Sequence, residues 1–397
     1  MDIKDIDDCT IAPSRTPGVE RSDTNGTTSD KTKEDAPLMK KLKVGFLAFP
    51  WPIPAIGYGG IERAVDSLCR GLVARGHDVR LWSATSSTCP VPRSGIIDLP
   101  EDSDGWHSAP IELTHVLAGY EWLESEGVDV IHDITFAGPL LGPSLVDIPV
   151  VTTNYLPFTP PEPEKGNSWP DLSRIYRAMA RNVPVLAISQ AQADAADGFT
   201  PHTILLGLDV DHIPVGDGRG DERGPYAAFY ARMSPEKGAK EAILAARAAG
   251  VRLKIAARIT EAHEIAYFRD EIEPLIDGTQ VEFVGELSRE DGYAFLGSAV
   301  ALLHPISWPD TFGTSTVESL ATGTPVLALR GGAVDEVVES GVTGKVCDTV
   351  DELADALREW TTYERESCRK AAEERFSNER VVDDHIDFYR SMLEGRR

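Results

Sequence analysis

The sequence predicts an α/β protein made of two doubly wound domains that face each other across a cleft, and three observations support this prediction. Short apolar runs, such as those within 39–49 and over 226–230, alternate with longer segments of helical periodicity. Steady alternation of strand and helix is typical of a parallel sheet with helices on both faces. The alternation begins twice, on either side of the glycine-rich segment 215–225, and 397 residues suit two domains of ordinary size.

The first series begins with a buried strand within 39–49, followed by a loop rich in proline and glycine and a helix over 61–76. Apolar residues of this helix recur at the i, i+3, i+4 and i+7 spacing that gives one apolar face. Gly76 is expected to end the helix. The later elements are a strand over 78–82, a helix through 116–123, strands over 128–132 and 149–153, a helix over 172–182 and a strand over 184–188.

The second series repeats this alternation and ends in a helical tail. Its strands are predicted over 226–230, 251–257, 280–284, 300–303 and 326–329. Its helices are predicted after 238, around 265–276, near 293 and over 315–321. The segment 351–393 is predicted to be helical with a break near 376–378.

These patterns divide the chain into four parts. Residues 1–38 are rich in Asp, Thr, Ser, Pro and Gly without apolar periodicity, which is typical of a disordered tail. They also lack the apolar core of a signal peptide. We expect a first domain over 39–210, a second domain over 211–375 and a final helical segment over 376–397.

Composition excludes several classes of partner. A net charge of −25 argues against nucleic acid or an anionic membrane as a partner, and no apolar run is long enough to span a bilayer. No residues have metal-ligand spacing, so we expect neither a protein-held metal nor another cofactor. The five cysteines are odd in number and lack CxxC spacing, which favours free thiols and a cytoplasmic location.

The stretch 303–336 combines a helix start with two carboxylates. A strand runs through a proline-punctuated loop into Thr311-Phe312-Gly313-Thr314, where the predicted helix opens. Unpaired amides and the helix dipole favour a phosphate at such a helix start. Asp310 before the turn and Glu318 inside the helix would repel a phosphate, so each should accept bonds from hydroxyl groups instead. A ligand that is half phosphate and half polyol is a nucleotide sugar.

Cations for this phosphate are expected on the loop after the first strand of the second domain. Arg232 and Lys237 lie there, where a doubly wound domain binds its ligand, and both can bond phosphate oxygens. In the first domain, Gly59 and Gly60 precede a helix and would let the backbone approach a ligand closely, although a simple tight turn has the same pattern.

Three further groups lie at strand ends or turns. Glu336 follows a glycine pair and would bond a sugar hydroxyl or favour the N-terminus of its own helix. His132 and Asp133 end a strand of the first domain and supply titratable groups at the cleft, where a general base would lie. A lone histidine at a strand end is more often structural, and the same holds for His304.

Over 43–393 these motifs resemble the retaining glycosyltransferases of family 4, which have the GT-B fold of two Rossmann-like domains. The segments 57–65 and 72–79 are similar to that family's first strand-loop-helix, and 231–238 is similar to its phosphate-binding loop. The segment 308–328 resembles its E-x7-E signature, and 331–338 resembles the loop that follows. Three positions depart from the family: Ala231 replaces a frequent glycine, Asp310 replaces the first glutamate, and Ile134 replaces a histidine that touches the transferred sugar.

The resemblance implies roles for the candidate residues. The first domain would hold the acceptor and the second the donor, and the final helix would cross back to the first domain. The implied catalytic residues are Arg232, Lys237 and Asp310; the donor-binding residues are Gly59, Gly60, Gly313, Thr314, Ser315, Glu318 and Glu336; and the acceptor-side residues are His132 and Asp133.

The implied activity is retaining transfer of a hexose-type sugar from a nucleotide-sugar donor to the hydroxyl of a small-molecule or glycan acceptor. Two alternatives stay open. One is a GT-B enzyme of another reaction, such as an epimerase or an enzyme that couples non-sugar units. The other is a non-catalytic relative that binds nucleotide sugars, which Ile134 makes conceivable.

Overall fold

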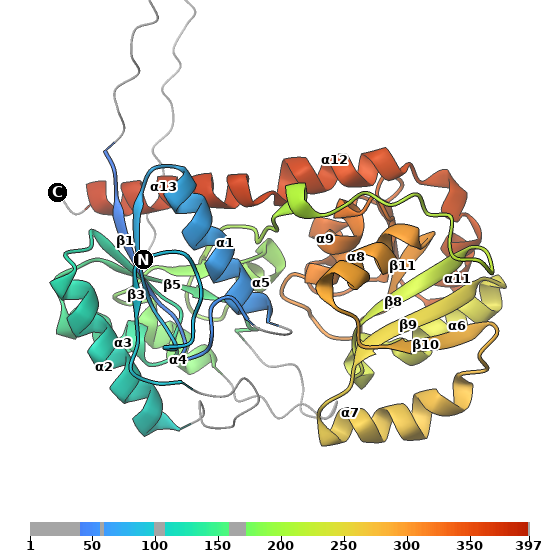
Figure 1. The fold of residues 1–397 in the computed structure, drawn as a ribbon, viewed down its shortest axis with the longest axis horizontal. Coiled ribbons are helices and arrows are strands. Elements are labelled where there is room, and N and C mark those ends of the chain that lie inside the picture. The colour runs from blue at the N-terminus through green and yellow to red at the C-terminus, as the bar shows by residue number, and fades with distance from the viewer. Residues whose placement is uncertain (1–39, 56–58, 99–107, 159–171, 396–397) are drawn as a thin grey trace, which may run out of the picture. The chain divides into compact units, whose positions relative to one another are not determined.

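The computed structural model describes residues 40–55, 59–98, 108–158 and 172–395, so the predicted tail over 1–38 lies outside the described residues. The described part contains two sheets with helices packed on them (Figure 1). Their strand orders are β3-β2-β1-β4-β5-β6-β7 and β10-β9-β8-β11-β12-β13. Every strand pair in both sheets is parallel, which confirms the predicted α/β class with two doubly wound sheets.

The first sheet and its helices occupy the chain up to residue 212. The strands are β1 (Lys43–Leu47), β2 (Asp78–Trp82), β3 (Arg93–Ser94), β4 (Val130–Asp133), β5 (Val150–Asn154), β6 (Val185–Ala187) and β7 (His202–Thr203). The helices are α1 (Gly60–Ala74), α2 (Ala109–Ser125), α3 (Gly138–Leu145), α4 (Ser173–Met179), α5 (Gln190–Asp194) and the 3₁₀ turn η3 (Val210–His212).

Alternate residues of β1 show how the helices cover this sheet. Val44 and Phe46 belong to a buried apolar cluster that includes residues of α1. Leu47 belongs to a second cluster that includes residues of α2. Gly45 leaves room for that second layer, because a Cβ at this position would lie 2.8 Å from the Leu123 side chain. Period-two alternation along the strand therefore places α1 and α2 on opposite faces.

The second sheet is built from the later part of the chain. Its strands are β8 (Tyr226–Arg232), β9 (Arg252–Arg258), β10 (Val281–Gly285), β11 (Ala301–His304), β12 (Val326–Leu329) and β13 (Gly344–Cys347). The helices and turns are η4 (Pro235–Lys237), α6 (Ala239–Ala249), α7 (Ala262–Tyr267), the π-helical η5 (Phe268–Ile272), η6 (Glu273–Leu275), α8 (Arg289–Ser298), α9 (Thr314–Ala321), α10 (Val334–Val337), α11 (Val350–Arg358), η7 (Trp360–Thr362) and α12 (Arg365–Phe376).

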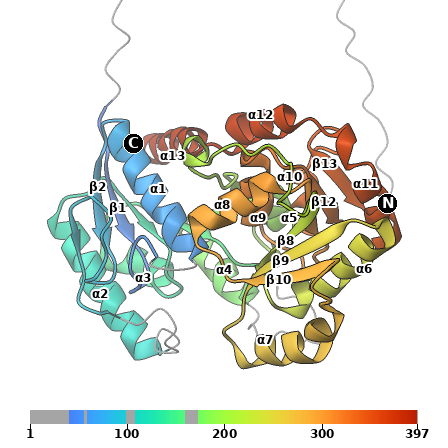
Figure 2. The same ribbon diagram turned by 45° about the vertical axis from the view of Figure 1, so that its right-hand side comes forward.

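This sheet is also covered on both faces. Tyr226 and Ala228 of β8 lie in an apolar cluster with residues of α8, α9 and α12. The intervening Ala227 and Phe229 lie in a cluster with residues of α6 and α11. Figure 2 shows α8 and α9 on one side of β8 and β9, and α6 on the other.

The last helix, α13 (Asn378–Glu394), packs against the first sheet. It begins after Ser377, whose hydroxyl accepts a bond from the Arg380 amide. It contacts α1, and Val382, Ile386 and Tyr389 join the apolar cluster on the α1 side of that sheet (Figure 1). The chain therefore returns to its first sheet after completing the second.

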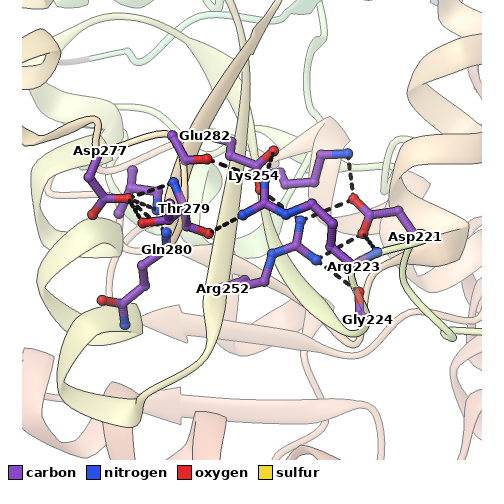
Figure 3. A network of polar contacts seen from close by, with 11 residues as sticks. Asp221, Arg223, Gly224, Arg252, Lys254, Asp277, Thr279, Gln280 and Glu282 are labelled. Atoms are coloured by element: carbon purple, nitrogen blue, oxygen red, sulfur yellow. Dashed lines mark hydrogen bonds and ion pairs between the residues drawn. The ribbon is translucent and has the colours of Figure 1, made fainter.

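An ionic network fastens the segment before β8 to the starts of the neighbouring strands (Figure 3). Arg252 of β9 donates to both oxygens of Asp221 and to Glu282 of β10, over 2.8, 3.2 and 2.7 Å. The Lys254 ammonium reaches Asp221 at 3.0 Å, and Arg223 pairs with Glu282 at 2.9 Å. These groups lie at the amino ends of the strands, whereas a doubly wound sheet binds its ligand at the carboxyl ends. We therefore assign the network to the stability of the fold.

None of the described helices combines the length and the apolar character that crossing a bilayer requires.

Candidate functional site

Two loops at the carboxyl end of the second sheet lie directly against each other. The turn after β8 runs through Ser234 to Gly238, and the loop after β11 begins at Pro305. The Ser307 amide donates to the Glu236 carbonyl over 2.9 Å. Gly238 has a left-handed φ of 78°, and a Cβ there would overlap the Pro305 carbonyl oxygen. A glycine is required because both the backbone angle and the close approach exclude a side chain.

This contact brings Lys237 and Asp310 together. The Lys237 ammonium donates to Asp310 over 3.0 Å, and both side chains are about four-fifths buried, at 18% and 21% exposed. Burial favours the neutral acid, but the Lys237 ammonium and His304 outweigh it and hold the pKa of Asp310 below its ordinary value. Asp310 is therefore an ionised acceptor beside a cation.

The glycine pair after β12 supports Asp310 from behind. The Ala333 amide donates to the Asp310 carbonyl over 3.0 Å. Gly332 adopts a φ of 53°, and a Cβ there would overlap backbone atoms of Asp310. Its neighbour Gly331 has room for a Cβ, with the nearest atom 3.6 Å away. Only the second glycine is therefore demanded by the geometry.

Helix α9 begins beside this pair. Gly313 occupies its N-cap position with φ 78° and ψ 63°, a left-handed conformation that glycine adopts without strain. The first amides of a helix have no intrahelical acceptor, so those of Thr314 and Ser315 can serve an anion. The predicted helix start at 313–315 is thus present in the structure, with its amides near the end of β11.

His304 lies among these residues, although a histidine at a strand end is more often structural. It ends β11, is only 4% exposed, and its Nε2 has no hydrogen-bond partner within the described part of the chain. A Cβ at Gly313 would lie 3.7 Å from this nitrogen. Burial, reinforced by Lys237 and opposed by Asp310, lowers the pKa of His304 to about 4, so the ring is neutral near pH 7.

Glu318 lies one turn into α9 and is 8% exposed. Burial raises its pKa to about 7, although the nearby charges of Arg63 and Arg289 oppose the change. Asp310 and Glu318 therefore have pKa values moved in opposite directions within one loop and helix. Such divergence is frequent in functional sites.

Arg232 ends β8 and is surrounded by carboxylates. Its guanidinium donates to Glu264 over 3.1 Å and lies 3.5 Å from Glu236 and 3.8 Å from Glu261. Glu264 is fully buried and also accepts the amides of Thr260 and Glu261 at the start of α7. Glu264 lies on α7, outside the motif that contains Arg232, so the motif does not predict it. Its hydrogen bond helps to fix the position of the Arg232 guanidinium.

Three donor-binding candidates, Gly59, Gly60 and Glu336, lie at or against the start of a helix. Gly59 caps α1 in an extended conformation, and a Cβ there would overlap Ala55, whereas Gly60 has open space around it. The rest of that glycine loop, 56–58, lies outside the described residues. The Glu336 carboxylate accepts the amides of Gln190, over 2.7 Å, and of Ala191 at the start of α5. It serves a helix N-terminus, but that of α5 and not of its own helix.

The acceptor-side candidates lie in the core of the first sheet. Both ring nitrogens of His132 are used, by Tyr389 at 2.6 Å and by Thr153 at 2.8 Å, and the ring is 1% exposed. Asp133 is fully buried and accepts bonds from Tyr120 and Thr135 over 2.8 Å each. Burial raises the pKa of Asp133 to about 7. The structure thus gives both residues packing roles and does not join them to the group around Lys237.

Two family models match the chain. One, described as "Glycosyl transferases group 1", matches residues 217–375, and the other, "Glycosyltransferase Family 4", matches residues 58–212. The first match contains Arg232, Lys237, Asp310 and Glu318, and the second contains Gly59 and Gly60.

Curated relatives match over different lengths. The chain is 26% identical to N-acetyl-alpha-D-glucosaminyl L-malate synthase of Bacillus anthracis, over 27% of this chain and 30% of that protein. It is 34% identical to D-inositol 3-phosphate glycosyltransferase of a Nocardioides species, over 28% and 26%. The matched part thus spans less than a third of these two relatives. Phosphatidyl-myo-inositol mannosyltransferase of Propionibacterium freudenreichii is 24% identical over 68% and 73%.

Solved structures share the fold over nearly their whole length. A glycosyltransferase involved in avilamycin A biosynthesis superposes with a TM-score of 0.63 at 24% identity, covering 89% of this chain and 98% of that one. Sucrose-phosphate synthase of Thermosynechococcus elongatus gives 0.72 at 16% identity, covering 89% and 100%. Anabaena HepE with bound UDP-glucose gives 0.66 at 19% identity, covering 88% and 100%.

Proposed function

Because this chain belongs to the family 4 glycosyltransferases with the GT-B fold, we propose that it moves a hexose-type sugar from a nucleoside diphosphate sugar to an acceptor hydroxyl. The observation that carries the proposal is the Lys237–Asp310 pair at the start of α9. Three groups therefore lie close together: the Lys237 ammonium, the ionised Asp310 carboxylate, which can accept hydrogen bonds from sugar hydroxyls, and the first amides of α9. A nucleotide sugar presents the matching groups: a diphosphate and a polyol.

The residues of the second sheet would act mainly through charge and position. As the bond between the sugar C1 and the phosphate oxygen breaks, negative charge develops on the departing diphosphate. Lys237, Arg232 and the first amides of α9 would stabilise that charge. Asp310 would accept bonds from sugar hydroxyls and Glu318 from the ribose, which fixes the donor before transfer.

We propose that transfer retains the configuration at C1. The acceptor oxygen bonds C1 on the face that the diphosphate leaves, and the acceptor proton passes to the departing phosphate oxygen. This route needs no protein nucleophile. The packing roles of His132 and Asp133 are compatible with it, because neither side chain is available in the described structure to attack a sugar.

The relatives support the donor class. HepE was solved with UDP-glucose, and the catalytic domain of a starch synthase was solved with ADP. One matching relative is named a mannosyltransferase and another a glycogen synthase. These names favour a hexose but point to no single nucleobase.

The test is a panel of UDP-glucose, ADP-glucose and GDP-mannose. The true donor should raise the melting temperature, since it binds only the folded chain. The same donor, incubated with a panel of sugar and polyol acceptors, should give a glycoside whose anomeric NMR signals match the donor's configuration.

The other outcomes separate the alternatives. An inverted product would refute retention, and an epimerised donor or a product without a glycosidic bond would indicate a different GT-B reaction. Stable binding with no consumption of donor in the presence of any acceptor would indicate a non-catalytic relative. Ile134 motivates this alternative, because it is 6% exposed in the apolar core and offers no polar group to a sugar.

A further inference from the structure

A buried imidazole with one unpartnered nitrogen lies beside the start of α9, the proposed diphosphate position. His304 is 4% exposed, and its Nε2 bonds no group in the described part of the chain. A buried polar group left without a partner destabilises the folded state. Buried polar groups are usually satisfied, so an exception suggests a partner that joins in the functional state.

The position of Nε2 indicates where such a partner would lie. The nitrogen lies 3.7 Å from the position that a Cβ of Gly313 would occupy, at the N-cap of α9. Gly313 has φ 78° and carries no side chain, so none stands between its backbone and Nε2. The nitrogen therefore lies beside the helix start, on the strand side.

The helix start beside the ring favours an anionic partner. Lys237 and Asp310 both act on the ring electrostatically and bond each other over 3.0 Å. One carboxylate oxygen of Asp310 already accepts a hydrogen bond from Lys237. The first amides of α9 have no acceptor within the helix and face outward along its axis. A neutral imidazole can carry its proton on Nε2 and donate it, as those amides do.

We propose that His304 is a diphosphate-binding residue, whose Nε2–H donates a hydrogen bond to a phosphate oxygen of the nucleoside diphosphate held at the start of α9. The inference rests on the proposed function, because it takes the ligand to be a nucleotide sugar. It adds a donor from the end of β11 to the cation of Lys237 and the amides of Gly313, Thr314 and Ser315. Three elements then converge on one group.

The test compares diphosphates with nucleosides on three variants. UDP, ADP and GDP are titrated by calorimetry against the wild-type chain, alongside uridine, adenosine and guanosine. His304→Phe fills the same space without a donor, and His304→Gln restores an N–H of similar reach. His115→Phe is the matched control, because His115 is also fully buried with an unpartnered ring nitrogen but lies on α2 of the first sheet.

His304→Phe should bind the preferred diphosphate about tenfold more weakly or worse, since a hydrogen bond to a charged group is lost. Its affinity for the matching nucleoside should stay unchanged. His304→Gln should recover most of the diphosphate affinity, and His115→Phe should bind like the wild type. Diphosphate affinity in His304→Phe equal to that of the wild type would overturn the role of His304, while leaving donor binding intact.

A second measurement covers the case in which His304→Phe fails to fold. In wild-type protein labelled with ¹⁵N-histidine, the preferred diphosphate should shift the Nε2 resonance that is missing from His304→Gln. A resonance unmoved by saturating diphosphate would also overturn the role. A wild-type chain that binds none of the three diphosphates would instead refute the proposed function itself, so the two failures are distinct.

Discussion

Two carboxylates eight positions apart in the chain respond differently to burial. Asp310 has Lys237 at 3.0 Å, and its pKa falls below the ordinary value. Glu318 has cations only at longer range, and burial raises its pKa to about 7. The distance to the nearest cation, more than the degree of burial, therefore decides whether each carboxylate is ionised before the ligand binds.

Glu318 should make donor binding depend on pH. The ionised carboxylate accepts bonds from ribose hydroxyls on both oxygens, whereas protonation turns one oxygen into a donor, so affinity for the nucleotide sugar should fall several-fold as the pH drops from 8 to 6. In Glu318→Gln the affinity should be weaker and nearly constant over this range. Calorimetry at several pH values measures both, and parallel curves for the two proteins would refute the assignment.

The same residue should affect stability with a defined sign. Its folded pKa of about 7 exceeds the ordinary value of 4.5, so between these values the folded state binds more protons than the unfolded state. Glu318 therefore lowers stability as the pH rises from about 4.5 to 7, by up to about 3 kcal/mol. Urea unfolding should show Glu318→Gln gaining stability over the wild type at pH 8 and not at pH 4; a constant difference would contradict this.

Lys237→Ala should reduce turnover by roughly 100-fold or more, since a group that stabilises the departing diphosphate is removed. Loss of the ammonium also leaves the burial of Asp310 less opposed, so the pKa of Asp310 should rise. The control is Lys240→Ala on α6, whose ammonium pairs with Glu271 on the exposed surface over 2.7 Å. Steady-state kinetics should show Lys240→Ala near the wild type, and equal loss in both variants would remove the specific role of Lys237.

At the residue scale, the sequence predicted which groups would gather but not their partners. Lys237 and Asp310 were assigned to one ligand from motif positions, and the structure pairs them. The sequence does not predict His304 as a ligand-binding residue. Its proposed role depends on a buried nitrogen without a hydrogen-bond partner, and only the packing of the folded chain produces that. Glu336 was expected near a sugar or its own helix, but its partners at Gln190 and Ala191 are about 145 positions away in the chain.

At the scale of elements, the loops after β8, β11 and β12 form one supported unit. The β8 loop meets the β11 loop at Gly238, and the β12 loop backs Asp310 through Gly332. Each junction depends on a glycine with positive φ where a side chain would overlap a neighbouring backbone. The position of Asp310 is thus determined by three strand ends together.

Gly332→Ala should therefore disturb the site through the backbone. Its φ of 53° and the overlap with Asp310 should reduce stability by at least about 1 kcal/mol and weaken binding of the nucleotide sugar. Gly331→Ala is the matched control, because the added Cβ would have 3.6 Å of clearance. Thermal melts and calorimetry of the two variants should differ clearly; similar behaviour would refute the support that Gly332 gives to Asp310.

Strong periodicity made most elements predictable, and long-range packing explains the misses. The strand at 326–329 and the break near 377 agree with β12 and with the Ser377 cap between α12 and α13. The predicted helix over 265–276 is instead a short α7 followed by π and 3₁₀ turns. The two-residue strands β3 and β7 carry too few residues to show any period and exist only through pairing with β2 and β6.

At the scale of the whole molecule, α13 packs against α1 and the first sheet after the chain has completed the second sheet. Its apolar face completes the cluster on the α1 side of the first sheet, through Val382, Ile386 and Tyr389. The Tyr389 hydroxyl bonds Nδ1 of His132 on β4, and the two rings meet edge-on. Stability of the first sheet therefore depends on residues that follow the second sheet in the chain.

Tyr389→Phe tests this dependence without changing the volume of the core. It leaves Nδ1 of the buried His132 without its partner and should lower the free energy of unfolding by about 1–3 kcal/mol. Tyr363→Phe removes a hydroxyl from a partly exposed position and should change that free energy by less than about 0.5 kcal/mol. Affinity for the nucleotide sugar should stay at the wild-type value in both, because the proposed donor site belongs to the second sheet.

Urea unfolding measures the stability of the two variants, and calorimetry measures their affinity for the nucleotide sugar. Unaltered stability in Tyr389→Phe would show that the hydroxyl contributes nothing to docking of α13. A selective loss of affinity would place α13 in the donor site instead.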